Sequence, residues 1–172
     1  MQTFIVLLKG INVGGNNLLP MKDFVAQLKK VNYESVSSYI QSGNIVLKST
    51  ANPTKNIQSL VLNHYGFTPE IFVFTESTFV QSSIHNPFNE CDGKCVHFYF
   101  CQNNIELVQE KIDTFLAETE QYTVKGNIFY LYAPNGIGRS KLVANIEACL
   151  GQKATGRNLN TINNISSMVK NT

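Results

Sequence analysis

The first half of the chain alternates between two apolar patterns. Runs of neighbouring apolar or β-branched residues predict strands over residues 3–9, 35–41, 44–49 and 70–75. Helical spacing of apolar residues predicts one helix that begins after Pro20 and another that begins at Pro53. Ser42-Gly43 separates the two middle strands and predicts a hairpin turn. The order strand–helix–strand–strand–helix–strand is the ferredoxin-like pattern.

The second half begins with the same pattern and departs from it near its end. A short helix over 77–84 and a polar loop, HNPFNECDGK, separate the halves. The next elements are a strand over 95–101, a helix over 105–116, a hairpin of strands over 121–125 and 127–133, and a helix over 139–150. Where a last strand is due, KATGRNLNT predicts a loop, and a helix over 161–169 follows it. We therefore predict an α+β protein of two small ferredoxin-like units in tandem, at 1–85 and 95–172, joined by a loop at 86–94. The second unit ends in an extra C-terminal helix.

Composition and charge are those of a folded domain. With 43% hydrophobic and 15% charged residues, the chain has enough apolar mass for a core. A net charge of +2 is too small to indicate a nucleic-acid partner. The N-terminus lacks the features of a signal peptide, and no apolar run approaches the roughly 18 residues of a membrane span. We predict a cytoplasmic protein without a membrane partner, in which all four cysteines stay reduced. The oligomeric state is not predicted.

The loop after the first strand, GINVGGNN, has the Gly10-to-Gly15 spacing of a phosphate-binding loop. It lacks the lysine and the hydroxyl residue that such loops require, and no helix begins directly after it. We therefore exclude a nucleoside-triphosphate loop of that type. Gly14 and Gly15 still permit close approach of the backbone to a ligand, with a tight structural turn as the alternative.

An antiparallel ferredoxin-like sheet brings this glycine loop beside the turn QSGN, residues 41–44, because both emerge at the same end of the sheet. The polar side chains that then surround the glycines are Lys9, Asn12, Ser42 and Asn44. We predict that they form one half of a ligand site.

Both arginines occupy glycine-containing loops that precede helices. Of the 14 basic residues, only Arg139 and Arg157 are arginine, and all the others are lysine. Arginine binds carboxylate or phosphate in a bidentate fashion, and the predicted helix starts carry no acid. We predict a second half-site for an anion at Arg139, Ser140, Lys141, Arg157 and Asn158. The alternative is that each arginine caps backbone carbonyls or pairs with a surface acid.

Other motifs are weaker. His85, Cys91, Cys95 and His97 have no second Cys/His pair, so no metal site is predicted. The stretch KGNIFYLY matches an RNA-binding signature at Lys125, Gly126, Phe129 and Tyr132, but Asn127 replaces an aromatic residue. Together with Phe98 on the neighbouring strand, these aromatic residues support an alternative hypothesis, in which the protein is an RNA-binding module. No catalytic motif is present, so the question of enzyme activity stays open, and no cofactor is predicted.

Five stretches, LLKGINVGGNNLLPM, YIQSGNIVL, NPF, PNGIGRSKL and TGRNLNTI, resemble the domain of unknown function 1697 family of mostly bacterial proteins. The resemblance spans nearly the whole chain and implies a compact cytosolic α+β protein with no established activity. The motif residues it carries over are Gly10, Asn12, Gly14, Gly15, Ser42, Gly43, Asn44, Gly138, Ser140, Arg157, Asn158 and Thr161. Lys9 stands where the family usually has Arg, and Leu159 where it usually has Trp.

From these features we predict a protein that binds a small anionic ligand, a nucleotide or a phosphorylated metabolite. Whether the two half-sites share one cleft is not predicted. The alternatives are an RNA-binding module that uses Phe98, Phe129 and Tyr132, and a structural or protein-interaction domain.

Overall fold

A computed structural model describes all residues, 1–172, and divides the chain into two compact units. Unit 1 comprises Met1–Gln81 together with Asn164–Thr172, and unit 2 comprises Ser82–Asn163. The boundaries fall within helix α3 (Glu76–Ile84) and helix α7 (Leu159–Lys170). The division differs from the predicted 1–85 and 95–172 because the end of the last helix belongs to unit 1.

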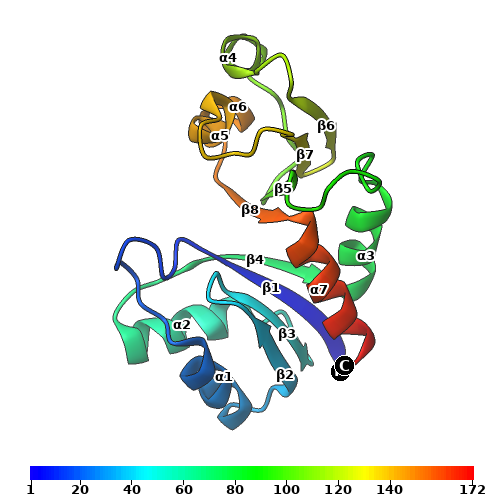
Figure 1. Ribbon diagram of the computed structural model, residues 1–172. Coiled ribbons are helices and arrows are strands. Elements are labelled where there is room, and N and C mark those ends of the chain that lie inside the picture. Colours follow the sequence, from blue (N-terminus) through cyan, green and yellow to red (C-terminus); the bar gives the residue numbers. More distant parts are fainter. The chain divides into compact units, whose positions relative to one another are not determined.

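Unit 1 is built on a four-stranded antiparallel sheet with the order β2-β3-β1-β4 (Figure 1). Its elements are β1 (Gln2–Lys9), α1 (Met21–Lys30), β2 (Glu34–Tyr39), β3 (Asn44–Ser49), α2 (Thr54–Tyr65) and β4 (Glu70–Thr75). β1 lies in the interior of the sheet and β2 at an edge. This pairing matches the strands and helices that the apolar pattern predicts for the first half.

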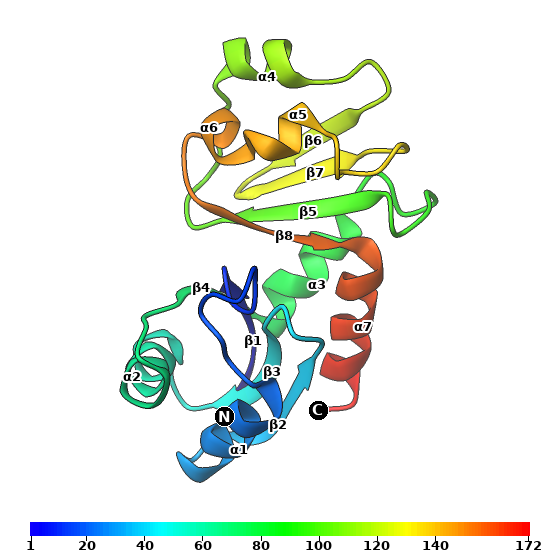
Figure 2. The ribbon, with the colours of Figure 1, turned by 60° about the vertical axis from the view of Figure 1, so that its left-hand side comes forward.

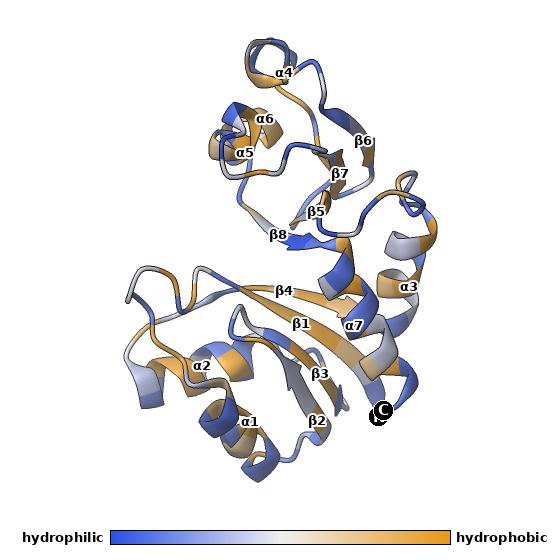
Figure 3. Cartoon of the chain, in the orientation of Figure 1, coloured by the Kyte–Doolittle hydropathy of each residue, from blue (hydrophilic) through white to orange (hydrophobic).

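The composition of the strands of unit 1 follows their place in the sheet. β1 has apolar side chains on both faces, and Figure 3 shows it as hydrophobic along its length, whereas the edge strand β2 is paler. Alternate β1 residues, such as Val6, join the core beneath α1 and α2, where Phe24 and Ile57 are fully buried. On the other face, Phe74 of β4 contacts Phe79 of α3 with ring centroids 6.3 Å apart. A strand covered on both sides is expected to read as a continuous apolar run.

Unit 2 contains a second four-stranded antiparallel sheet, with the order β6-β7-β5-β8. Its elements are β5 (Val96–Cys101), α4 (Gln109–Phe115), β6 (Gln121–Lys125), β7 (Ile128–Tyr132), α5 (Lys141–Ala144), α6 (Ile146–Leu150) and β8 (Ala154–Asn158). The three helices lie on one face of this sheet (Figure 2). They pack over Tyr99 and Phe129, with Ile112, Leu142 and Leu150 from the helices completing the core. The α+β class is thereby confirmed, with two separate antiparallel sheets.

The prediction of a loop over KATGRNLNT was wrong, because residues 154–158 form β8 and pair with β5. Few of these residues favour a strand by themselves, so the pairing partner decides their conformation. Gly156 also suits the position: a Cβ atom there would lie 2.7 Å from the Tyr99 Cε1. Gly156 therefore permits close approach of the Tyr99 ring on the neighbouring strand.

The predicted helix over 139–150 was also wrong in its start and its continuity. Arg139 precedes the helix, Ser140 is the N-cap, and Asn145 divides the segment into α5 and α6. No helix combines the length and the apolar composition needed to cross a membrane.

Candidate functional site

The glycine loop after β1 and the turn between β2 and β3 lie side by side in unit 1. The Asn12 side chain donates hydrogen bonds to the carbonyl oxygens of Leu19 (2.9 Å) and Gln41 (2.8 Å). Its Oδ1 accepts a hydrogen bond from the Leu19 N–H at 2.8 Å. The Leu8 N–H donates to the Gly43 carbonyl at 2.8 Å. The topology therefore produces the proximity that the sequence suggested.

Asn44 stabilises the turn from inside. Its buried Nδ2 donates to the Tyr39 carbonyl and to the Ser42 Oγ, both at 3.0 Å. Because an amide has only two N–H groups, the donors of Asn12 and Asn44 are both used within the loops. We assign these two side chains to loop architecture rather than to direct ligand contact.

Gly43 has the strictest steric requirement in the turn. Its φ is +84°, and a Cβ atom there would lie 2.7 Å from both the Leu8 Cβ and the Ile11 Cδ1. Only glycine meets both conditions. Gly14 and Gly15 also have positive φ, but they form the exposed tip of the loop, which the Val13–Asn16 bridge closes.

Lys9 ends β1 as a half-buried residue, and its Cα is in register with that of Glu70 on β4. A cross-strand pair of opposite charge is a common structural arrangement at such a position. Lys9 therefore has a carboxylate of its own chain as its neighbour across the sheet.

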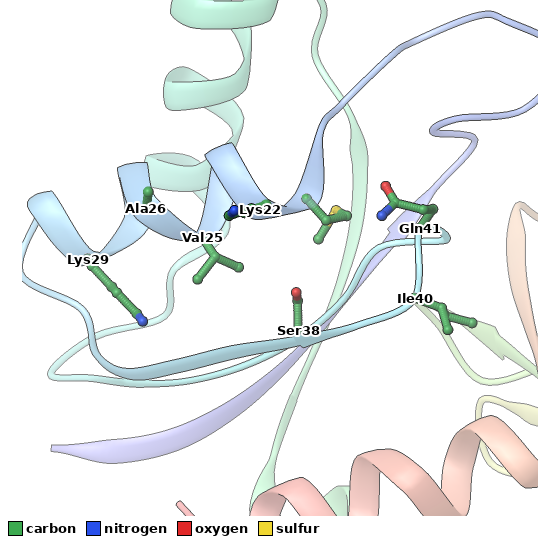
Figure 4. A pocket seen from close by; sticks show the side chains of 8 residues that line it. Lys22, Val25, Ala26, Lys29, Ser38, Ile40 and Gln41 are labelled. Carbon is green, nitrogen blue, oxygen red and sulfur yellow. The ribbon is translucent and has the colours of Figure 1, made fainter.

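A groove of about 510 Å³ lies between α1 and β2 in unit 1. Eight residues line it: Met21, Lys22, Val25, Ala26 and Lys29 from α1, Ser38 from β2, and Ile40 and Gln41 from the turn that follows. Val25 and Ser38 point toward one another across the groove, and the Lys29 ammonium lies near one end while Gln41 lies near the other (Figure 4). The lining contains two cations, an apolar floor and no acidic side chain.

Lys22 and Lys29 were not among the site residues predicted from the sequence. Both are exposed on a helix whose apolar stripe was recognised, and lysine on the outer face of a helix is ordinary. The signal that was available is their spacing: seven residues, or two turns, which puts them on the same side of α1. Only the topology shows that this side faces Ser38 and Gln41, and Gln41 is part of the turn that Asn12 contacts.

In unit 2, an acidic side chain of the chain itself, that of Glu120, lies at the start of α5. The Ser140 Oγ donates to the Glu120 Oε2 at 2.6 Å and accepts from the Val143 N–H at 3.2 Å. The Glu120 Oε1 accepts from the Ala117 N–H at 2.8 Å, and only 8% of this residue is exposed. Burial, with a smaller contribution from Glu120, raises the pKa of the nearby Tyr99. The first turn of α5 carries no acid of its own, as predicted, but an acid from twenty residues earlier in the chain lies at its start.

The two arginines have different environments. Arg139 is exposed, as is Lys141. Arg157 lies within β8, where its Nη1 donates to the Thr155 Oγ1 (2.7 Å) and to the Gly156 carbonyl (2.8 Å), and burial lowers its pKa to about 10. The Asn158 Oδ1 accepts from the Thr161 N–H at 2.9 Å in the first turn of α7. The expectation of Arg157 in an open loop was wrong because β8 extends through it.

Two of the three aromatic residues of the RNA-binding hypothesis, Phe98 and Phe129, are fully buried and cannot stack on a base. Phe129 is fully buried in the core beneath the helices, where it stacks on Tyr122 at 5.2 Å. Phe98 is fully buried against Tyr130, with ring centroids 4.8 Å apart. Tyr132 is partly exposed and stacks on Phe88. The match to the RNA-binding signature therefore reflects strand-core aromatics.

His97 is a buried polar residue of unit 2 with one unsatisfied ring nitrogen. It is 8% exposed, its Nε2 has no hydrogen-bond partner, and burial lowers its pKa against the opposing effect of a hydrogen bond to the Lys94 backbone. Its neighbours do not form a metal-binding set, since no group of three His, Cys, Asp or Glu side chains is placed to hold a metal ion. All four cysteines are free thiols.

Fold and site together define a small α+β protein of two four-stranded antiparallel sheets, with an open cationic groove beside an edge strand. Comparison with family models makes the assignment more specific. Residues 1–130 match the family described as "Protein of unknown function (DUF1697)", and the chain belongs to that family.

A solved structure supports the fold assignment over the whole length. The conserved bacterial protein SP0830 from Streptococcus pneumoniae is similar with a TM-score of 0.69 and 22% sequence identity, over 98% of each chain. Identity at this level supports the fold and says nothing about a ligand. No functionally curated protein matches the chain significantly.

Proposed function

We propose that this protein binds a small anionic ligand and that the groove between α1 and β2 is the binding site. The observation that carries the proposal is the lining of the groove, which contains Lys22 and Lys29, several apolar side chains and no acidic residue. An anion placed there gains two ammonium donors, and its apolar part contacts Val25 and Met21.

The size of the groove is compatible with this proposal. Its volume of about 510 Å³ lies within the range of small-molecule sites, roughly 300–1,000 Å³. Nucleotides and phosphorylated metabolites are the first ligand classes to test, since each joins an anionic group to a larger body. The Gln41 side chain adds an amide donor and acceptor at the far end from Lys29.

The residues predicted from the sequence take two places in this proposal. Asn12, Ser42 and Asn44 support the groove by fixing the turn that presents Gln41. Arg139 and Lys141 are exposed cations of unit 2, and their role as a separate anion site stays a prediction.

Thermal unfolding with a panel of nucleotides, sugar phosphates and short RNA tests the proposal. We expect an anion to raise the unfolding midpoint of the wild type and to lose this effect in Lys22→Met/Lys29→Met. Lys30→Met removes the same charge from an exposed position of α1 outside the groove, and is the matched control. A midpoint shift that survives in the double variant and disappears in Arg139→Ala would move the site to unit 2. No shift with any anion would refute the proposal.

We further propose that each unit is ferredoxin-like, because each pairs its first strand between its third and fourth strands in a βαββαβ order. A bacterial source and a cytoplasmic location, in which the free thiols stay reduced, complete the proposal.

A further inference from the structure

β2 is an edge strand, and its outer side faces no other strand of the sheet. Strand edges of this kind present unpaired backbone N–H and C=O groups and accept an additional strand. A bulge between Glu34 and Ser37, with Ser35 at a φ of +50°, disrupts the beginning of β2. The regular part that remains, Ser37–Tyr39, leads directly to the groove.

The groove lies next to this edge strand, because α1 runs along β2 and the side chains of Val25 and Ser38 face one another across the channel between them (Figure 4). We infer that this channel accepts an acidic peptide segment of a partner protein, which adds to β2 in extended conformation. The inference rests on the proposed function, since it names the class of anionic ligand that the same groove binds.

Charge complementarity selects an acidic occupant. Lys22 and Lys29 border the channel, and the only acid of α1, Asp23, does not line it. The two lysines are two helical turns apart, about 10.5 Å along the axis, with Val25 and Ala26 between them. A compact ion does not fill such a channel. An extended chain has alternate side chains on the same face at about 6.7 Å spacing, so three of them cover the distance.

Three side chains of the peptide should therefore point toward α1, in the order acidic, apolar, acidic. The apolar one contacts Val25, whose side chain points into the channel opposite Ser38. Ile40 supports an apolar contact at the end of the channel, because this β-branched residue is 49% exposed and has a φ of +51°. Such a conformation is unfavourable for a β-branched residue, and here it presents an apolar side chain to solvent.

The probe that follows from this geometry is acetyl-Glu-Ser-Val-Ser-Glu-amide, titrated by NMR into the full-length protein. We expect binding that Lys22→Met and Lys29→Met each weaken roughly two- to fivefold, as is typical of exposed ion pairs. Lys30→Met leaves the affinity unchanged. The reversed-charge peptide, with Lys in place of both Glu residues, does not bind.

Two N-methylated versions of the peptide distinguish strand addition from simple charge attraction. In a strand added to an edge, alternate N–H groups face the edge and the others face solvent. We expect N-methylation at one alternate set to abolish binding and at the other set to preserve it. Equal binding of both versions would overturn the strand-addition inference while the anion site stands.

The other outcomes separate the inference from the function on which it rests. Binding of a nucleotide or sugar phosphate that needs Lys22 and Lys29, without binding of the peptide, overturns the inference and supports the proposed function. Binding of neither probe class overturns both. Circular dichroism of each variant establishes that the fold is intact.

Discussion

Replacement of Gly43 by alanine tests the packing of the turn that presents Gln41 to the groove. At a φ of +84°, a non-glycine residue costs about 1–2 kcal/mol. The added Cβ would also lie 2.7 Å from the side chains of Leu8 and Ile11, both buried in the core, and overpacking of this kind costs about 1–3 kcal/mol. We therefore expect Gly43→Ala to lower the free energy of unfolding by about 2–5 kcal/mol.

Gly66 provides a matched control in the same unit. Its φ of +79° is almost the same, but nothing lies within 4 Å of an added Cβ. Gly66→Ala should therefore lower the free energy of unfolding only by the cost of a non-glycine residue at positive φ, about 1–2 kcal/mol. Urea unfolding of wild type and both variants, with midpoints and slopes compared, measures the difference. Equal destabilisation by the two substitutions would show that the contacts of Gly43 with Leu8 and Ile11 do not constrain the turn.

Three further predictions concern unit 2. Ser140→Ala removes the N-cap of α5 and a donor to a buried carboxylate, and should lower the free energy of unfolding by about 0.5–2 kcal/mol in the same urea assay. Burial raises the pKa of Tyr130 to about 12 from 10.0, so the stability it contributes is present below pH 10 and decreases as the pH rises toward 12. The free energies of unfolding of wild type and Tyr130→Phe should therefore approach one another between pH 10 and pH 12. A difference that stays constant over this interval would contradict a raised pKa for Tyr130. Cys101, whose pKa burial raises to about 11, and the buried Cys149 should react with a thiol reagent at pH 8 far more slowly than the two partly exposed cysteines, and equal rates would argue against the described core.

The two inner strands of unit 1 could be predicted because burial on both faces of a sheet requires continuous apolar sequence. β1 and β3 show that signal directly. β8 could not be predicted in this way, because its residues are polar or small and its conformation depends on pairing with β5. The break at Asn145 was missed for a related reason, since the apolar spacing continues across it while the backbone hydrogen bonding does not.

The polar residues of the loops were recognised as significant, but their role could not be assigned from the sequence. An asparagine in a glycine-rich loop suits ligand contact and backbone capping equally well, and the contacts of Asn12 and Asn44 are to backbone and loop groups. Glu120 was overlooked as the partner of Ser140 because the two are distant in sequence. Lys22 and Lys29 carry no local signal beyond their spacing, so only the packing of α1 beside β2 identifies the groove.

Chemical-shift mapping tests the central claim most directly. In ¹⁵N-labelled protein titrated with the acidic pentapeptide, and separately with a nucleotide, the claim predicts saturable shifts of backbone amides in α1 and residues 38–41 of unit 1. Saturation of these shifts should require a higher ligand concentration in Lys22→Met/Lys29→Met and the wild-type concentration in Lys30→Met. Shifts confined to unit 2 around Arg139, or no saturable shifts with either anion, would contradict an anion-binding groove between α1 and β2.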